Sequence, residues 1–351
     1  MFGGLKVAID KEIEHCFDIA IREAQKSDDL IAEALTHTKK IALSGGKRIR
    51  GALLCQAYFG FGGKEKKKIL KVAAAIELVH LFLLVHDDII DCGNLRHGEE
   101  TLHKMLEKKY QKNITAEQAR HFGESIAIIG GGMLYAIANR IILEAGFSLQ
   151  ETTRALVQLQ KIVATTIIGQ SQDISIERKR NVSEKEVLAM YENKTARYTF
   201  EGPLYLGALL SGCDDKKILR SLSSYAVPLG IAFQIQDDIL GIFGQEKKIG
   251  KSVASDIEEG KISLMVARAQ KTATKEQIKK LNAILGKKKL IKKEITIFKD
   301  ILISSGALGY AQDFARLYLN RGKAEIEKII ILPESKKFLS DLVVYLEGRE
   351  V

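Results

Sequence analysis

The sequence contains very little proline and no tryptophan. Its three prolines are Pro203, Pro228 and Pro333, in a chain of 351 residues. Because proline interrupts helices and is common in turns, this scarcity argues against a loop-rich fold or a β-sandwich. Hydrophobic residues make up 46% of the chain, which is enough for a sizeable buried core. The first expectation is therefore a set of long helices around such a core.

Cysteine is also scarce, and its spacing follows no functional pattern. Cys16, Cys55, Cys92 and Cys213 have neither the spacing of a metal site nor that of a disulfide framework. Such cysteines are typical of the reducing cytosol, and residues 1–15 lack the apolar core of a signal peptide. We find no run of about 18 apolar residues, the length of a membrane helix. The sequence therefore predicts a cytoplasmic protein without a membrane span.

The charge is not balanced, because the formal net charge is +10. Such a charge is the usual starting point for a nucleic-acid hypothesis. The lysines, however, fall in separate short clusters beside helical apolar patterns, where a solvated helix face is the ordinary explanation. These clusters are KEKKK (64–68), KKYQK (108–112), KEQIKK (275–280) and KKKLIKK (287–293). With no basic motif interleaved with aromatic residues, we predict no nucleic-acid partner, and anionic small molecules stay open as partners.

Apolar residues recur at helical spacing through most of the chain. The clearest segments span residues 69–90, 124–143, 153–174 and 223–243. Short glycine-containing breakers separate them, and no stretch of alternating polarity indicates a strand. Because no linker or low-complexity segment divides the chain, we predict one all-α domain over residues 1–351, with about ten or more helices.

Two short segments crowd aspartates into otherwise apolar helices. On a helix, Asp87 and Asp91 lie one turn apart on one face. The complete set is Asp87, Asp88 and Asp91 in VHDDIID (85–91), and Asp237 and Asp238 in IQDDILG (235–241). Either group alone would be explained as a helix cap or a solvated edge. Two such groups facing each other would repel unless a cation lay between them, and ligands that are all oxygen suit Mg²⁺.

Candidate phosphate-binding residues accompany these aspartates. The segment SGGKRIRG (44–51) places Lys47 and Arg50 on one helical face after two glycines. His80 lies two turns before Asp87, on nearly the same line of the helix. The other candidates are Arg96, His97, Lys194, Thr195, Lys251 and Lys261. Each alone would be an ordinary surface residue, but their joint presence beside magnesium-type aspartates favours a diphosphate site.

These segments resemble the successive motifs of trans-isoprenyl diphosphate synthases, also called polyprenyl synthetases. The matching motifs are GGKRIR, HLFLLVHDDIIDCGNLRHG, GQSQD, NKT and FQIQDDILGIFGQEKKIGKSVASDIEEGK, in the family's order, over residues 40–270. The resemblance implies mostly antiparallel helices around a central cavity, and a Mg²⁺-dependent prenyltransferase that works as a homodimer. In its reaction an allylic diphosphate ionises. The double bond of isopentenyl diphosphate attacks the resulting cation, and a proton is lost.

The resemblance also implies roles for the residues around the metal. Mg²⁺ ions would bridge the oxygens of the allylic diphosphate to the two aspartate motifs, chiefly to Asp87, Asp91 and Asp237. Lys194 and Lys251 would stabilise the departing pyrophosphate.

Further roles follow for the substrate side. Lys47, Arg50 and His80 match the positions that hold the diphosphate of isopentenyl diphosphate. The remaining assignments are Arg96 to the allylic diphosphate, the oxygens of Thr195 and Gln234 to the cation site, and Asp238 and Lys261 to a supporting shell.

Five positions depart from the family pattern: Gly51, His97, Gly132, Gly241 and Ser252. Gly51 and Ser252 replace typical prolines, and Gly132 stands where an aspartate is common. The other two bear on substrate and metal binding. His97 stands where relatives usually carry a second arginine that helps to hold isopentenyl diphosphate. A neutral histidine has fewer donors than the planar fork of arginine, so we expect weaker binding of this substrate. Gly241 ends the second motif where a third aspartate can stand, which leaves Asp237 as the main metal contact there.

Product length depends on the floor of the cavity below the first motif. Phe82 is the fifth residue before the first aspartate, a position that in the family often decides product length. A bulky aromatic there stops elongation early. The helical wheel does not direct Phe82 toward the carboxylate face, so core packing is its plain alternative. The resemblance predicts twenty-carbon geranylgeranyl diphosphate, with fifteen-carbon farnesyl diphosphate second.

Two other functions use the same fold. A non-catalytic or weakly active subunit would keep the helices, but the intact aspartate motifs argue against it. A terpene cyclase also binds magnesium and a prenyl diphosphate. It has no need of an isopentenyl site, so Lys47, Arg50 and His80 distinguish the two enzymes.

Overall fold

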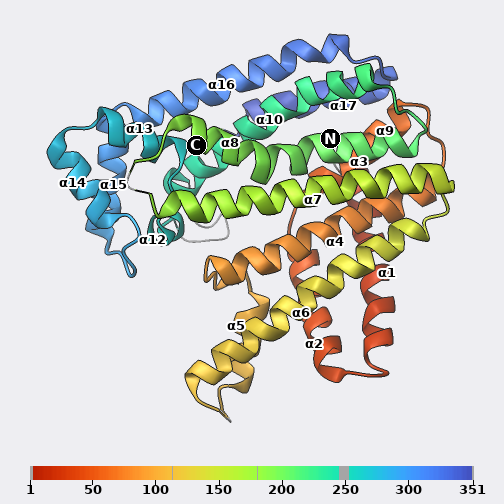
Figure 1. Ribbon diagram of the computed structural model, residues 1–351, viewed down its shortest axis with the longest axis horizontal. Coiled ribbons are helices and arrows are strands. Elements are labelled where there is room, and N and C mark those ends of the chain that lie inside the picture. Colours follow the sequence, from red (N-terminus) through yellow and green to blue (C-terminus); the bar gives the residue numbers. More distant parts are fainter. Residues whose placement is uncertain (1–2, 113, 180, 245–252, 350–351) are drawn as a thin grey trace.

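Almost all of the described chain is helical (Figure 1). The computed structural model describes residues 3–112, 114–179, 181–244 and 253–349. The helices before residue 180 are α1 (Gly3–Ala24), α2 (Asp29–Ser44), α3 (Ile49–Gly60), α4 (Lys66–Ile90), α5 (Leu102–Tyr110), α6 (Ala116–Leu143) and α7 (Leu149–Glu177). Those after it are α8 (Glu184–Tyr191), the π-helix η1 (Glu192–Glu201), α9 (Gly202–Leu210), α10 (Lys216–Phe243), α12 (Ser255–Glu259), α13 (Leu264–Thr272), α14 (Lys275–Ile284), α15 (Lys292–Ser304), α16 (Ala307–Glu325), the 3-10 helix η2 (Ile326–Lys328) and α17 (Pro333–Glu347). The predicted all-α class with ten or more helices is confirmed.

The few prolines are placed where helices tolerate them best. Pro203 and Pro333 lie in the first turns of α9 and α17, where a backbone N–H has no partner inside the helix. Pro228 lies inside α10, which continues through it to Phe243. Long helices therefore persist because proline rarely falls in their interiors.

A short hairpin directly after the first aspartate motif was not expected from the sequence. The strands β1 (Leu95–Arg96) and β2 (Glu99–Glu100) pair antiparallel. His97 and Gly98 form the turn with φ of 52° and 82°, as the commonest two-residue hairpin turn requires. Strands of two residues are too short to show alternating polarity, so the prediction of no strand was wrong here.

Helix α4 forms the centre of the larger hydrophobic core. Its middle turns are fully buried and pack against α6, α3 and α1. On the other side of the molecule, α10 packs against α16 and η1 (Figure 1). The two aspartate motifs lie near the C-terminal ends of α4 and α10, so the packing of these two helices positions the motifs.

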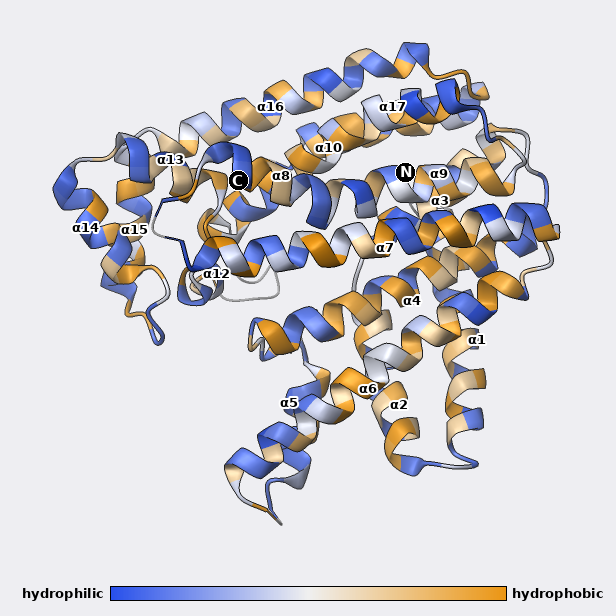
Figure 2. Cartoon of the chain, viewed as in Figure 1, coloured by the Kyte–Doolittle hydropathy of each residue, from blue (hydrophilic) through white to orange (hydrophobic). Residues whose placement is uncertain are grey.

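Three helices, α4, α6 and α10, are long and apolar enough to cross a membrane by length and composition. These windows are apolar on average but are not uninterrupted apolar runs, and the absence of a membrane span stays a prediction. In α4, 72% of the apolar window is buried inside the protein, and in α10 56% is buried. Internal packing thus accounts for most of the apolar length of these two helices. In α6, 39% of the window is buried, and its apolar residues colour much of the helix in Figure 2.

Two glycines allow α7 and α10 to approach the π-helix closely. A Cβ added at Gly169 of α7 would lie 2.3 Å from the backbone N of Lys194, and one at Gly230 of α10 would lie 2.4 Å from Ala196 Cα. No side chain fits at such distances, so glycine is required where these helices touch η1. A π-helix is rare and often marks a functional site. Here its close packing fixes the positions of Lys194 and Thr195.

Replacement of Gly230 with alanine should lower the free energy of unfolding by about 1–3 kcal/mol, because the methyl group has no space against Ala196. The matched control is Gly309→Ala in α16, where an added Cβ meets nothing within 4 Å. Alanine there should raise stability by about 0.5–1 kcal/mol through its higher helix propensity. Urea unfolding followed by circular dichroism measures both variants. Equal effects at the two positions would contradict the close contact.

Candidate active site

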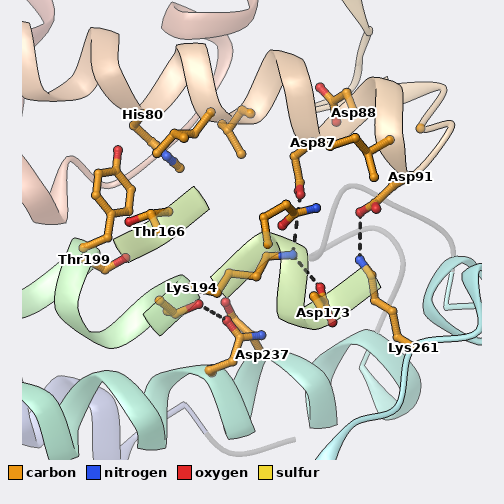
Figure 3. Close-up of a pocket in the computed structure, with 18 of the residues that line it drawn as sticks. His80, Asp87, Asp88, Asp91, Thr166, Asp173, Lys194, Thr199, Asp237 and Lys261 are labelled. Carbon is orange, nitrogen blue, oxygen red and sulfur yellow. Dashed lines mark hydrogen bonds and ion pairs between the residues drawn. The ribbon is translucent and has the colours of Figure 1, made fainter. Parts of the chain in front are cut away.

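A cavity of about 1670 Å³ lies between the ends of α4 and α10. Residues of α4, α7, η1, α10 and α12 line it, together with the β1–β2 hairpin and the end of α17. It exceeds the usual volume of a single small-ligand pocket, about 300–1,000 Å³, and has room for two substrates. Figure 3 shows that Asp87 and Asp173 point toward Lys194, and Asp91 toward Lys261, across this space.

Asp87 of the first motif faces Lys194 of the π-helix (Figure 3). Lys194 Nζ is 3.5 Å from Asp87 Oδ1 and 2.6 Å from Asp173 Oδ2 of α7. Burial alone would raise the pKa of Asp87, but Lys194, Lys261 and Arg96 outweigh it and hold the pKa below its usual range. Burial likewise tends to lower the pKa of Lys194, but Asp87 and Asp173 raise it. This lysine therefore stays protonated and keeps its charge in the cavity.

The other two aspartates of the first motif each have a cation of their own. Lys261 Nζ is 3.0 Å from Asp91 Oδ2 and 2.8 Å from Glu259 Oε2. Arg96, on β1, donates to Asp88 through Nη2 and through Nε at 3.1 Å. Burial raises the pKa of both Asp88 and Asp91 even with these cations beside them. The unexpected hairpin therefore has a clear role, because it returns Arg96 to the helix end.

The second motif is arranged differently, because Asp238 is held by neutral donors. Tyr191 Oη donates to Asp238 Oδ2, and Gln234 Nε2 donates to Asp238 Oδ1 at 2.8 Å. Thr195 Oγ1 in turn donates to Gln234 Oε1 at 2.6 Å. The two predicted cation-site residues, Thr195 and Gln234, are thus joined to Asp238 in one hydrogen-bonded chain.

Asp237 makes its contact with a residue that the sequence did not single out. Arg349, just after α17, places Nη2 at 2.5 Å from Asp237 Oδ1. The Asp237 side chain is 39% exposed, and it points into the cavity in Figure 3.

Gly241, the departure at the end of the second motif, has a steric cause. A Cβ added at this position would lie 2.1 Å from Asp256 Oδ2 of α12. The buried Asp256 carboxylate thus occupies the space next to the motif where a third aspartate would begin. This chain has a carboxylate here, but α12 supplies it instead of α10.

The donor set fits magnesium bound together with a diphosphate. Carboxylate oxygens suit Mg²⁺, which is commonly bound by one or two carboxylates plus substrate phosphates. Among the residues that the structure describes, no three His, Cys, Asp or Glu side chains converge as a ready metal cage. Phosphate oxygens would complete the coordination, and the surrounding lysines and arginines suit such an anion.

The predicted isopentenyl site lies in the same cavity. Arg50 donates through Nη2 to Thr199 Oγ1 at 2.8 Å and lies over the Tyr198 ring, 4.6 Å from its centroid. Its buried Nε has no hydrogen-bond partner among the described residues, which is a donor suited to an anion. The His80 ring also packs on Tyr198, with 6.0 Å between the two ring centroids. Lys47 contacts the Tyr345 hydroxyl and ring from α17.

His97 occupies a left-handed turn position beside the glycine-rich segment. A Cβ added at Gly45 would lie 2.7 Å from His97 Cγ, so the ring packs directly on that backbone. Burial lowers the pKa of His97, which outweighs a hydrogen bond to the backbone of Ile41. Without diphosphate bound, His97 is therefore a neutral side chain near pH 7.

Phe82 packs in the hydrophobic core and also lines the cavity, so both roles considered for it are compatible with its position. It is 9% exposed and belongs to the hydrophobic core, yet it also lines the cavity. Its ring packs in a tilted stack on Tyr135 of α6 and edge to face on His86, with centroid distances of 5.0 and 4.8 Å. The Tyr135 hydroxyl donates a hydrogen bond to Gln160 Oε1 of α7. Phe82 is therefore a firmly packed aromatic residue in the lining of the cavity.

The structure brings the predicted site residues together. Every described one lines the cavity: Lys47, Arg50, His80, Phe82, Asp87, Asp88, Asp91, Arg96, His97, Lys194, Thr195, Gln234, Asp237, Asp238 and Lys261. Lys251 lies outside the described residues. Sequence reasoning did not single out several further lining residues, among them Asp173, Asp256, Tyr345 and Arg349. The segments GQSQD and SVASDIEEGK carried a signal for the two aspartates, but no pattern marked the two residues near the C-terminus.

Comparison with known proteins identifies the family. Residues 30–301 match the family described as polyprenyl synthetase. A geranylgeranyl diphosphate synthase from Saccharolobus solfataricus is 34% identical over 338 residues, which cover 95% of this chain and 94% of that protein. A geranylfarnesyl diphosphate synthase from Aeropyrum pernix is 31% identical over 326 residues, 92% of this chain and 95% of that protein.

The fold agrees with a solved structure of the same kind. A geranylgeranyl pyrophosphate synthase from Corynebacterium glutamicum, complexed with isoprenyl diphosphate and magnesium, superposes with a TM-score of 0.94. The two chains are 26% identical, with 100% of each covered. The chain belongs to the polyprenyl synthetase family, and the prediction of an all-α prenyltransferase is confirmed.

Asp238 should make the stability of the metal-free protein depend on pH. Burial raises the pKa of Asp238 to about 7, against the donors Tyr191 and Gln234, which lower it. Between about pH 4 and about pH 7 the folded chain therefore holds a proton that the unfolded chain has lost. The contribution of Asp238 to stability falls as pH rises through this window.

Asp238→Asn removes this titration, so its stability relative to wild type should improve by roughly 2 kcal/mol between pH 5 and pH 8. Urea unfolding of both proteins in the presence of a metal chelator measures the difference. A difference that stays constant across this range would show that Asp238 does not hold the extra proton.

Proposed function

We propose that the protein condenses isopentenyl diphosphate with an allylic prenyl diphosphate, head to tail, and forms geranylgeranyl diphosphate with release of diphosphate. The observation that carries this proposal is the convergence of both aspartate motifs and the Lys47–Arg50 segment on one cavity. An enzyme of this class needs two diphosphate sites side by side. The two aspartate motifs would form the site for the allylic diphosphate, and the Lys47–Arg50 segment would form the site for isopentenyl diphosphate.

We propose Mg²⁺ as the cofactor, held chiefly by Asp87, Asp91 and Asp237. Magnesium bound there would neutralise the allylic diphosphate and make it a better leaving group. The oxygen-only donors of these motifs fit this ion. The related Corynebacterium structure, which contains magnesium and isoprenyl diphosphate, supports the same assignment.

The chain's own residues then serve the ionisation step in two ways. Lys194, held protonated between Asp87 and Asp173, stabilises the negative charge that develops on the departing diphosphate. The oxygens of Thr195 and Gln234 present dipoles to the allylic cation. Together they lower the barrier to breaking the carbon–oxygen bond.

The second substrate is held on the opposite side. Arg50, with its unpartnered Nε, and Lys47 bind the diphosphate of isopentenyl diphosphate. His80 packs beside them, and burial lowers its pKa well below the usual value, so it acts as a neutral donor. This arrangement also opposes the cyclase alternative, because a cyclase has no isopentenyl diphosphate to hold.

The twenty-carbon product is proposed from Phe82 and from the relatives. Phe82 lines the cavity, and the Tyr135 ring packs against it from outside the cavity, which limits the length of the growing chain. The Saccharolobus relative is a geranylgeranyl diphosphate synthase, whereas the Aeropyrum relative of similar identity is a geranylfarnesyl diphosphate synthase. Several relatives are geranylgeranyl diphosphate synthases, and Phe82 in the lining of the cavity supports the same product.

We also propose that the protein is a homodimer formed through α6 and α7. These helices expose apolar side chains, with Ile128 51%, Ile129 54%, Val157 50% and Ile168 55% exposed. Exposed apolar residues grouped on neighbouring helices are typical of a subunit interface. A cytoplasmic location is proposed from the cysteines, which are all free thiols.

The direct test of the proposed function is a product assay. The purified protein is incubated with Mg²⁺, isopentenyl diphosphate and an allylic diphosphate of five, ten or fifteen carbons. Each primer should give the twenty-carbon diphosphate, and omission of Mg²⁺ or isopentenyl diphosphate should abolish it. Cyclic products formed without isopentenyl diphosphate would indicate a cyclase. The absence of any product would indicate a non-catalytic subunit.

Phe82→Ala should extend the product by one or more five-carbon units, because loss of the ring opens the wall of the cavity. Chromatography of the dephosphorylated products measures the chain length. The control is Tyr135→Phe, which keeps the stacked ring and removes the hydroxyl that contacts Gln160. It should leave the product length unchanged. An unchanged product in Phe82→Ala would refute the role of this wall.

A further inference from the structure

The end of α17 reaches into the active-site cavity and touches the second aspartate motif. Arg349 Nη2 lies 2.5 Å from Asp237 Oδ1, and its guanidinium lies over the Phe233 ring, 4.2 Å from the centroid. Phe233 and Asp237 are one turn apart on α10, so one face of that helix makes both contacts. The guanidinium thus forms an ion pair with Asp237, the carboxylate proposed as the main metal contact of the second motif.

The backbone around Arg349 is fixed rather than loosely placed. The carbonyl oxygen of Leu346 accepts hydrogen bonds from Gln236 Nε2 at 2.8 Å and from the backbone N of Arg349 at 3.2 Å. The first bond joins the end of α17 to α10, and the second sets the direction of the chain after Gly348. The Arg349 side chain is 16% exposed. Its place beside Asp237 is therefore part of the packed structure.

Arg349 also borders a second cavity, of about 270 Å³, between α10, α16 and α17. Its Nη1 is buried and has no hydrogen-bond partner among the described residues, and the same is true of Gln236 Oε1, which lines this smaller cavity. The side chain of Glu347 lines it as well. A donor without an acceptor and an acceptor without a donor thus border one space, which gives the guanidinium a second place to bind.

We propose that Arg349 is a displaceable counter-ion of Asp237. It neutralises this carboxylate in the metal-free protein and moves toward the smaller cavity when Mg²⁺ binds. The inference rests on the magnesium site proposed above. It makes metal binding at the second motif compete with an internal ion pair, and it couples that binding to the end of α17. Arg349 is a positioning residue in this account, because it acts through Asp237.

The ion pair has the strength that such an exchange requires. Arg349 and Asp237 form a charge-assisted contact on an aromatic face, which is enough to hold the carboxylate while the metal is absent. Asp237 is also partly exposed, so water screens the pair and a divalent cation can displace the arginine. A fully buried pair would resist that exchange.

Metal affinity without substrates tests the proposal. Binding of Mn²⁺, a spectroscopic substitute for Mg²⁺, is measured by electron paramagnetic resonance on the full-length wild type and on Arg349→Gln. The variant should bind Mn²⁺ about three- to tenfold more tightly, because the competitor is gone. In an Asp237→Asn background the same substitution should have no effect. A merely structural role for Arg349 would weaken binding, so a gain in affinity is specific to the competition.

The control is Lys337→Gln, which removes the same charge from α17. Lys337 pairs with Asp341, at 3.2 Å, on the same helix and should leave Mn²⁺ affinity unchanged. Unchanged or weaker binding in Arg349→Gln would overturn the proposal, as would the absence of Mn²⁺ binding in both proteins. The product assay is independent of this result, so failure of the counter-ion role and failure of the synthase function are distinguishable.

Discussion

The requirement that buried carboxylates be balanced by positive charge organises this protein. An unpaired charge away from water is strongly unfavourable, and the cavity gathers the aspartates of two motifs from two helices. In the structure Asp87 faces Lys194, Asp91 faces Lys261, and Asp237 faces Arg349. Protein cations thus hold the carboxylates that the proposed magnesium ions would bind. In the proposed reaction, metal and diphosphate would take the place of some of those partners before catalysis.

Several unusual local structures exist to deliver these cations. Lys194 lies on a π-helix. Gly169 of α7 and Gly230 of α10 let those two helices pack closely against it. Arg96 returns to Asp88 through a hairpin of two-residue strands. Each arrangement departs from regular helical geometry at a point where a cation meets an aspartate. The regular helices form the scaffold, and the π-helix and the β1–β2 hairpin place the cations of the site.

The sequence predicted the helices and most of the site, because both depend on patterns along one chain. The spacing of Asp87 and Asp91 on one helix face is such a pattern, and the apolar periodicity of α4 is another. Arg349 could not be predicted, because its role depends on α17 folding back onto α10. Asp256 was missed for a similar reason. Its position in the site depends on α12 packing into the space that Gly241 leaves beside α10. The apolar character of α4, α6 and α10 could be interpreted only with the fold, which shows how much of each helix is buried.

The most direct test of the central claim is calorimetric titration of the protein with inorganic pyrophosphate, with and without Mg²⁺. If the cavity exchanges its own cations for a metal–diphosphate cluster, pyrophosphate should bind about tenfold or more tightly with Mg²⁺ than in a chelator. Asp87→Asn together with Asp237→Asn should remove most of that difference. Equal binding of pyrophosphate with and without Mg²⁺ would show that the lysines and arginines alone hold the anion, and would contradict the account.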